Sequence, residues 1–512
     1  TKGCLNRLRL NPSNLSGNSE RDKMDKTYFI NQSTALTLVF FISLLFVFLG
    51  LFHSKKHQGL NNYLTANRNI GLFSLTTSLT ASALGAWILF GPVSASTWGG
   101  IGSIIGYSLG TAFPMLLLIF LGKKIRKEFP NGSTLVEFLR KKFGKSLFKL
   151  ILLMMIFYMF IFLCAEVTAI SVLINYISGT PLWLTALIVL LTTLTYTLYG
   201  GLRASLFTDN IQMIFILILL IVSFFIIKGF TLDQFSFGFI KVRNPHLISA
   251  SYIPGYTAGF TFFIAVAATN LFHQGNWQRV YAAKNFITLK RSLIVSFFII
   301  IPIVFYMGFI GMVAFSIDPN IRPDLGFFSL LLKENSTLLS LIVLTLGLTL
   351  TISTVDTLIN AISSLIVVDG KAVFKFNKKM KIDYLKFSKY LILMLSLISF
   401  VIASKGFDIL YLFLLADLFC CAFVVTIFYS FFDKRINEKI AYFSIIIGLI
   451  SGFLLFPTPD FSKSLLVGIF LSKELFPTFI NQSLLFSSFL VATFLPLIVL
   501  KVKNLNNTRL YK

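Results

Sequence analysis

The chain has 512 residues, of which 56% are hydrophobic and only 13% are charged, and its formal net charge is +25. This composition excludes an ordinary soluble globular protein and indicates an integral membrane protein whose main partner is the lipid bilayer. The basic excess does not indicate a nucleic-acid partner, because basic residues of membrane proteins collect in cytoplasmic loops.

Apolar windows of about 20 residues predict an all-α polytopic protein with thirteen spanning helices. The expected spans are 33–52, 73–97, 101–122, 148–177, 181–199, 207–230, 257–275, 292–316, 337–368, 387–404, 407–432, 440–456 and 482–500. We expect one transporter domain over 33–501, between an N-terminal tail (1–32) and a cytoplasmic tail (502–512). Because thirteen is odd, the two ends are expected on opposite sides of the membrane.

The loop charges predict the orientation. With the N-terminus outside, the inner segments carry 31 Lys and Arg residues and the outer loops carry 8. This bias favours a cytoplasmic C-terminus in the plasma membrane, the inner membrane of the cell. Six basic residues of the N-terminal tail lie on the wrong side for this orientation. We therefore expect residues 1–23 to be an extension upstream of a natural start at Met24; the alternative is a native tail.

Two of the expected spans contain residues that interrupt helices. The second has Gly85, Gly91 and Pro92 around Trp87, and the seventh ends in a polar run from Asn270 to Trp277. Interrupted spans in corresponding positions of two halves indicate a transporter binding site, because unwound backbone frees carbonyl groups for ions. The two spans are five apart, which predicts inverted five-helix repeats over 73–230 and 257–432, with an extra helix at 33–52 and C-terminal helices over 440–500.

The ninth span carries a polar cluster. Leu350, Ser353 and Thr354 fall at i, i+3 and i+4, so one carbonyl and two hydroxyls share a helix face that suits a hard cation such as sodium. The alternative is that these hydroxyls bond back to carbonyls of their own helix and assist packing.

Four acidic residues of the expected spans are functional candidates. Glu166, Asp356 and Asp417 lie deep in theirs, and buried acids in lipid are functional candidates by default. Asp209 follows the Gly200–Gly201 turn, where it could instead be a partner of the helix N-terminus.

Four stretches resemble motifs of the sodium:solute symporter family, which has a LeuT-type fold. They are "PNGSTLVEFLRKKFG" (130–144), "YGGLRASLFTDNIQ" (199–212), "GNWQRVYAAKN" (275–285) and "STVDTLINAISS" (353–364). They occur in the family's order, and the resemblance covers about residues 33–432.

The resemblance implies a sodium site between the second and ninth spans. Its ligands would be the carbonyl groups of Ala81, Leu84 and Leu350 and the hydroxyls of Ser353 and Thr354, with Asp209 close by. For the solute pocket the expected residues are Trp87, Tyr107, Asn270, Gln274, Trp277 and Asp417; for the aromatic residues among them, the alternative is packing or an interfacial belt.

These observations predict a sodium-coupled secondary active symporter that imports a small organic solute by alternating access, with sodium as the co-transported ion. The sequence leaves proline, urea, a monocarboxylate and a sugar open, and a small, partly aromatic pocket favours an amino acid such as proline or a urea-like solute. One alternative is proton coupling on the same fold through Glu166, Asp209 or Asp417. A second alternative is a membrane sensor that binds solute without pumping. Enzyme activity is not expected, because no Ser-His-Asp order, metal cluster or phosphate loop appears.

Overall fold

The computed structural model describes residues 28–55, 59–231, 233–333, 336–373, 383–433, 436–459, 464–466 and 484–510. The expected extension over residues 1–23 lies outside this range. Within the described residues the chain is helical, and two isolated bridges, Ile70 with Ala283 and Pro457 with Ser464, are the only strand-like pairings. The all-α class expected from the sequence is confirmed.

Eleven helices of the described chain are long and apolar enough to cross a membrane. They are α2 (Gln32–Lys55), α5 (Gly91–Glu128), α7 (Lys145–Ser178), α8 (Leu182–Phe230), α10 (Ile253–Phe272), α12 (Phe286–Ile317), α14 (Thr337–Val368), α16 (Tyr384–Ala403), α17 (Ile409–Tyr429), α18 (Glu438–Leu455) and α21 (Leu484–Leu510). Shorter helices connect them: α3 (Leu60–Thr65), η3 (Ala66–Arg68), α4 (Leu72–Ala83), η4 (Ala86–Leu89), α6 (Leu135–Lys142), α9 (Phe237–Arg243), η5 (Pro245–Ile248), α11 (Gln274–Ala282), η6 (Pro323–Leu325), α13 (Gly326–Leu331) and α15 (Gly370–Val373).

Two of the long helices contain a sharp turn at a glycine. The 49 residues of α8 would form a straight rod of about 74 Å, more than twice the hydrocarbon thickness of a bilayer, but the chain turns at Gly201, where φ is 58°. Within α5 it turns at Gly100, where φ is 53°. A Cβ at Gly100 would lie 2.1 Å from the carbonyl oxygen of Leu247, so the turn requires glycine. Two expected span boundaries fall at these glycines, but the expected number of thirteen spans is not confirmed.

Two spans are interrupted helices in the structure, and they are the two in which the sequence predicts an interruption. Between α4 and η4, Leu84 and Gly85 have non-helical backbone angles. Between α10 and α11, the helix stops at His273, where ψ is 106°. Arg279 is one of the 31 basic residues counted in the inner segments, but it is not a loop residue: it lies in α11 and its side chain is fully buried.

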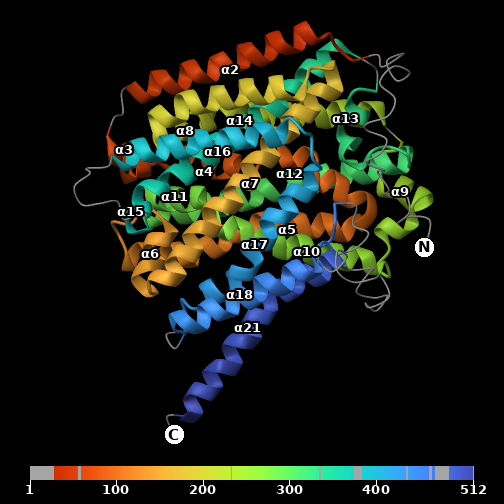
Figure 1. Ribbon diagram of the computed structural model, residues 1–512. Coiled ribbons are helices and arrows are strands. Elements are labelled where there is room, and N and C mark those ends of the chain that lie inside the picture. Colours follow the sequence, from red (N-terminus) through yellow and green to blue (C-terminus); the bar gives the residue numbers. More distant parts are fainter. Residues whose placement is uncertain are drawn as a thin grey trace.

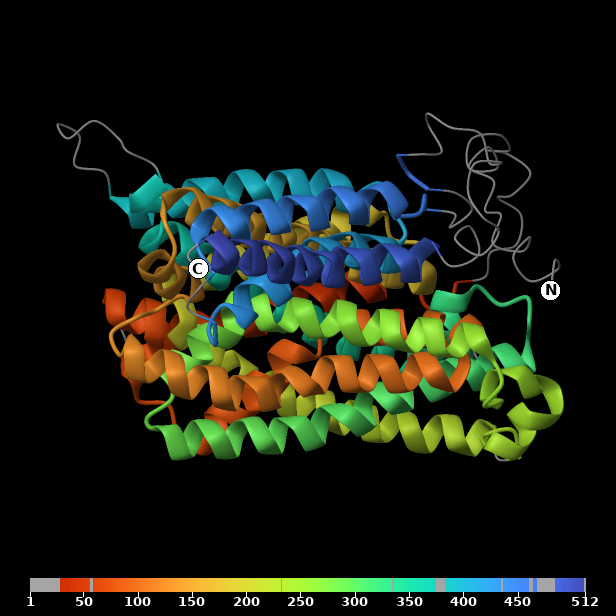
Figure 2. The same ribbon diagram turned by 90° about the horizontal axis from the view of Figure 1, so that it is seen from below.

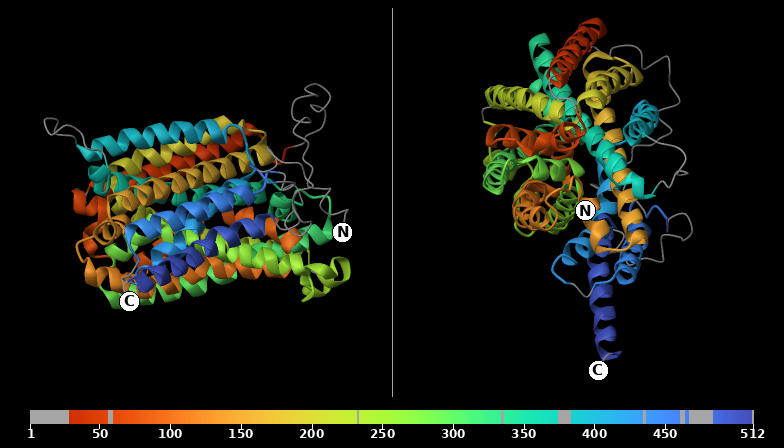
Figure 3. Two further views of the ribbon diagram at one scale, coloured as in Figure 1. Left: turned by 60° about the horizontal axis from the view of Figure 1, so that its bottom comes forward. Right: turned by 90° about the vertical axis from the view of Figure 1, so that its left-hand side faces the viewer.

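The long helices run side by side and α14 lies in the interior (Figures 1 and 2). It packs on α7 and α8, whereas α5 packs on α10 and α12. At the two edges of the bundle lie α2, which packs on α8, and the pair α18 and α21 (Figure 3). This arrangement places the break after α4 against α14, since both α4 and η4 contact that helix.

The bundle surface is apolar along α2, where five large side chains are more than half exposed: Phe40, Phe41, Leu44, Phe48 and Phe52. A soluble protein would bury such residues, whereas lipid tails cover them in a membrane. The basic helix α6 and the short helices α3 and α15 lie at one end of the bundle (Figure 1). The chain is a multi-pass membrane protein.

Candidate functional site

The break between α4 and η4 is held by a carboxylate from another helix. The backbone N–H of Ala86 donates to Oε2 of Glu166 on α7 over 2.9 Å, and Glu166 is fully buried. At the preceding turn the N–H of Leu84 donates to the carbonyl oxygen of Ala81 over 3.2 Å. The free N–H group at the start of η4 is therefore satisfied by a side chain rather than by water.

The polar face of α14 meets this break. Oγ of Ser353 donates to Oδ1 of Asp209 over 2.8 Å, so a ligand expected from α14 touches the acid expected beside the site. Thr354 donates to the carbonyl oxygen of Leu350 over 3.1 Å, which is the back-bond within its own helix that the sequence allows as an alternative. The expected ligands of α14 are thus all buried, and Ser353 among them contacts Asp209.

Three side-chain atoms converge on Gly85. A Cβ added there would lie 2.2 Å from Oε1 of Glu166, 2.8 Å from Oγ1 of Thr354 and 2.8 Å from Cδ1 of Trp87. Glycine at this position lets an acid from α7, a hydroxyl from α14 and an indole from η4 approach one another. Oε1 of Glu166 has no hydrogen-bond partner in the described structure, although Oε2 does.

Asp209 on α8 is the centre of a buried charged network. Its Oδ2 accepts from Arg279 over 2.8 Å and also from the hydroxyl of Ser78 on α4. Arg279 further donates to Ser78 over 2.7 Å, to Thr357 over 3.0 Å and to the carbonyl oxygen of Gly275 over 3.0 Å. The network joins α4, α8, α11 and α14, so both broken spans are tied to the same carboxylate.

A second buried carboxylate, Asp356 on α14, has only hydroxyl groups as hydrogen-bond partners. Asp356 accepts from the phenol of Tyr196 over 2.7 Å, from Ser205 over 2.9 Å and from Thr208 over 3.2 Å. All of these groups are buried. Asp356 therefore fastens α14 to both segments of α8.

The central region has more acids than bases. Within the described residues the structure has two ion pairs, Arg279 with Asp209 and an exposed Arg322 with Asp324. The buried carboxyl groups of Glu166, Asp356 and Asp417 therefore have no basic partner there. Because an isolated buried charge is costly, this region favours a bound cation or a proton on each acid.

Three of the expected solute-pocket residues lie near one another. The rings of Trp87 and Tyr107 stack with centroids 5.7 Å apart, and Tyr107 stacks on Phe262 at 4.3 Å. On α17, Oδ1 of Asp417 accepts from Thr269 over 2.6 Å, and Thr269 lies on α10, the helix that also carries Phe262.

The other three lie at the break between α10 and α11 and bond to the protein itself. Asn270 donates to the carbonyl oxygen of Val266 over 3.0 Å, and the indole N–H of Trp277 donates to that of Leu271 over 2.7 Å. Gln274 accepts from the N–H of Leu135 over 3.2 Å and so fastens the start of α6.

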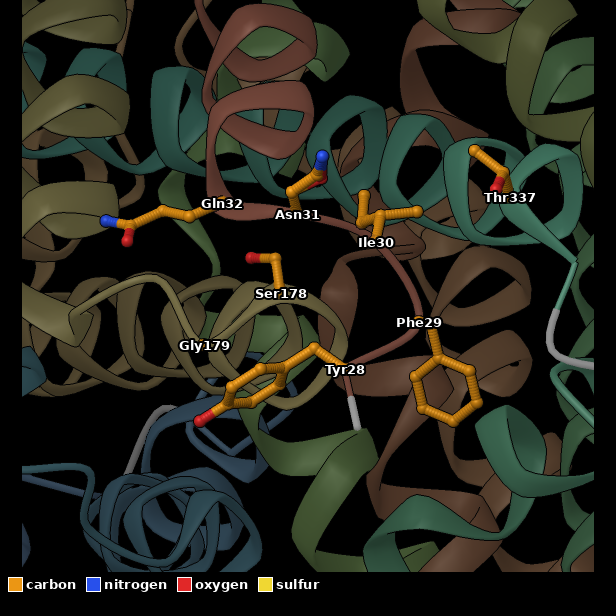
Figure 4. A pocket seen from close by; sticks show the side chains of 8 residues that line it. All are labelled: Tyr28, Phe29, Ile30, Asn31, Gln32, Ser178, Gly179 and Thr337. Atoms are coloured by element: carbon orange, nitrogen blue, oxygen red, sulfur yellow. The ribbon is translucent and has the colours of Figure 1, made fainter. Parts of the chain in front are cut away.

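Another hollow lies away from these acids, near the start of α2 (Figure 4). It is a shallow pocket of about 590 Å³ whose lining has no charged side chain: Tyr28, Phe29, Ile30, Asn31, Gln32, Ser178, Gly179 and Thr337. None of its lining residues belongs to the broken spans or to the acid cluster, and it is not part of the candidate site.

The sequence did not single out Arg279. Its large neighbours Trp277, Val280 and Tyr281 stand out from an otherwise polar run, and they are the signal that could have indicated burial. Nothing local in the sequence indicates that α7 brings Glu166 to the break after α4.

The model of the sodium:solute symporter family matches residues 63–448. The spermidine transporter DUR31 of Candida albicans is 27% identical, over 75% of this chain and 72% of that protein. The sodium/myo-inositol cotransporter 2 of Bos taurus is 25% identical, over 82% and 68%. The solved structure of a Na+-coupled sialic acid symporter in its substrate-bound outward-open state is similar with a TM-score of 0.69, at 18% identity, over 90% of this chain and 97% of that one. This last likeness concerns the fold.

Proposed function

The chain belongs to the sodium:solute symporter family and is a transporter rather than an enzyme, and from this premise we propose that it imports a small organic solute by alternating access, driven by sodium. The solutes named for its relatives, spermidine and myo-inositol, are both small. Neither name supports proline or urea as the solute of this chain.

The observation that carries the proposal is the contact of the broken span with α14. Sodium prefers several hard oxygen ligands, and the carbonyl groups of Ala81, Leu84 and Leu350 lie on the two elements that meet there. The hydroxyls of Ser353 and Thr354 face the same region. Asp209 supplies negative charge beside it and orients the Ser353 hydroxyl.

Sodium would act by holding α4 and α14 together. A cation that binds the outward-open state more tightly than the inward-open state shifts the population towards the former, and its release on the cytoplasmic side reverses the shift. One sodium ion crossing 100 mV releases about 2.3 kcal/mol, enough for a roughly 40-fold concentration ratio of a neutral solute. No covalent step is needed.

The test is uptake into vesicles that contain the full chain, measured against external sodium concentration. Ser353→Ala with Thr354→Ala should raise the sodium concentration for half-maximal uptake at least tenfold, because two ligands are lost. The matched control is Thr345→Ala, which removes a back-bonded hydroxyl from the same helix. An unchanged sodium dependence in the double variant would refute the site assignment.

The orientation is also part of the proposal. The basic helix α6 carries Arg140, Lys141 and Lys142, and by the positive-inside rule its end of the bundle is the cytoplasmic one. In this orientation the start of α2 would lie outside, and we propose that the membrane is the plasma membrane. Labelling of single cysteines placed in α6 and in α9 by a membrane-impermeant reagent would test it, and labelling of α6 in intact cells would contradict it.

A second candidate is proton coupling on the same fold, which the unpaired acids favour. Glu166 has an orphaned oxygen, and Asp356 is held by hydroxyls alone, so either could carry a proton. This candidate predicts uptake that continues without sodium and increases with external acidity. The sodium titration described above separates the two.

A further inference from the structure

Glu166 occupies the position at which a transporter of this architecture can receive an anionic group. Half-helix N-termini at a broken span direct free N–H groups towards negatively charged parts of a solute. Here the N–H of Ala86 already donates to Oε2 of Glu166 over 2.9 Å. The protein thus provides its own carboxylate at the break, and a carboxylate of the solute placed there would be repelled.

The guanidinium of Arg279, which lies beside the broken spans, is already hydrogen-bonded to groups of the protein. Arg279 makes four hydrogen bonds, to Asp209, Ser78, Thr357 and the carbonyl oxygen of Gly275, and it is fully buried. Among the described residues no other basic side chain forms an ion pair with a buried acid. An anionic solute would find no free positive partner beside the broken span.

What remains available is a set of acidic side chains without a basic partner. Oε1 of Glu166 is buried, lacks a partner and lies beside the indole of Trp87. The aromatic stack continues from Trp87 to Tyr107 and on to Phe262 of α10. Asp417 of α17 accepts a hydrogen bond from Thr269 on that same helix α10. One carboxyl group, from α7, thus lies at the start of a short aromatic stack, and a second, from α17, is bonded to the helix that carries the last ring.

This combination is the chemistry that recognises ammonium groups. A cation is attracted electrostatically to the face of a Trp or Tyr ring, and this attraction is stronger where water is excluded, as it is at these buried residues. A buried carboxylate gives a charge-assisted hydrogen bond to an N–H donor and is itself stabilised by the pairing.

Resting on the proposed sodium-coupled transport, we propose that the solute is a protonated aliphatic amine, held by Glu166 and Asp417 against Trp87 and Tyr107. This replaces the expectation of an amino acid or a urea-like solute. A cationic solute also adds its own charge to that of sodium, so each cycle moves more than one positive charge inward.

The first test needs no variant. Purified full-length protein in liposomes, under an inward sodium gradient, should take up radiolabelled 1,4-diaminobutane, and unlabelled spermidine should compete. The neutral isostere 1,4-butanediol, and proline, urea and myo-inositol, should not compete. Sodium-driven uptake of one of these neutral or zwitterionic solutes with no amine uptake would overturn the inference and leave the proposed function intact. Amine uptake that ignores sodium would instead refute the proposed function.

The second test uses Glu166→Gln and Asp417→Asn, with Glu128→Gln, an exposed acid at the end of α5, as the matched control. Loss of one charge-assisted hydrogen bond should weaken amine binding roughly 10- to 100-fold. Binding is read from quenching of tryptophan fluorescence in detergent, so it does not depend on transport, and size-exclusion chromatography reports folding. A Glu166 variant with altered sodium affinity and unchanged amine affinity would assign that acid to the sodium site and overturn the proposal. For a variant that fails to fold, the competition series in the wild type decides.

Discussion

The ion pair of Asp209 and Arg279 gives the sharpest prediction about stability. Its atoms lie 2.8 Å apart and both side chains are fully buried. Replacing Arg279 by Gln leaves the carboxylate with the hydroxyls of Ser78 and Ser353 as its remaining partners. Replacing Asp209 by Asn leaves a buried guanidinium whose other acceptors are neutral.

The magnitude follows from the cost of an unpaired buried charge. Removal of one partner from such a pair lowers the stability of the fold by about 3–5 kcal/mol. Replacement of both partners by uncharged groups can leave the stability nearly unchanged. Each single variant should therefore be strongly destabilised, and the double variant Asp209→Asn with Arg279→Gln should lose less than the sum of the two. We also expect transport to fail in every variant that lacks Asp209.

The assay is a double-mutant cycle on the thermal stability of the purified protein, read by fluorescence-detected size exclusion. The coupling between the two substitutions should be favourable and amount to a large part of either single loss. Additive losses would show that the pair contributes no interaction of its own and would refute the reasoning. A double variant that recovers stability but not uptake would separate the structural role of the pair from the role of Asp209 beside sodium.

Two further predictions concern Gly85 and the basic helix α6. Gly85→Ala places a Cβ 2.2 Å from Oε1 of Glu166, so uptake should be lost at normal surface expression. The control is Gly229→Ala, whose Cβ meets no atom within 4 Å. Normal uptake by the Gly85 variant would contradict the packing at the break. The pKa of Lys142 is lowered from 10.5 to about 8, mainly because the side chain is partly buried and secondly because the positive charge of Lys124 is nearby. Between these values the unfolded chain binds more protons, so stability should rise with pH, and Lys142→Met should flatten that rise in melting temperature; identical profiles for both proteins would contradict it.

The sequence predicted those features of the site that depend on local pattern. Glycine and proline around Trp87 indicated a break, and the i, i+3, i+4 spacing placed Leu350, Ser353 and Thr354 on one face of α14. Both are set by the chain within one or two helical turns, which is the range over which periodicity is informative.

The features that the sequence could not predict depend on which helices meet. Glu166 reaches Ala86 across 80 positions of the chain, and Arg279 reaches Asp209 across 70. A lone Arg after a broken span is also expected in a loop, because charged side chains are normally exposed to solvent. Only the packing of α11 between α4 and α14 shows that this charge is buried.

The measurement that tests the account most directly is equilibrium binding of radiolabelled sodium to the purified protein without any solute. We predict saturable binding to the wild type and to Thr345→Ala, and its loss in Ser353→Ala with Thr354→Ala. Saturable binding of unchanged affinity in the double variant would contradict a sodium site between α4 and α14.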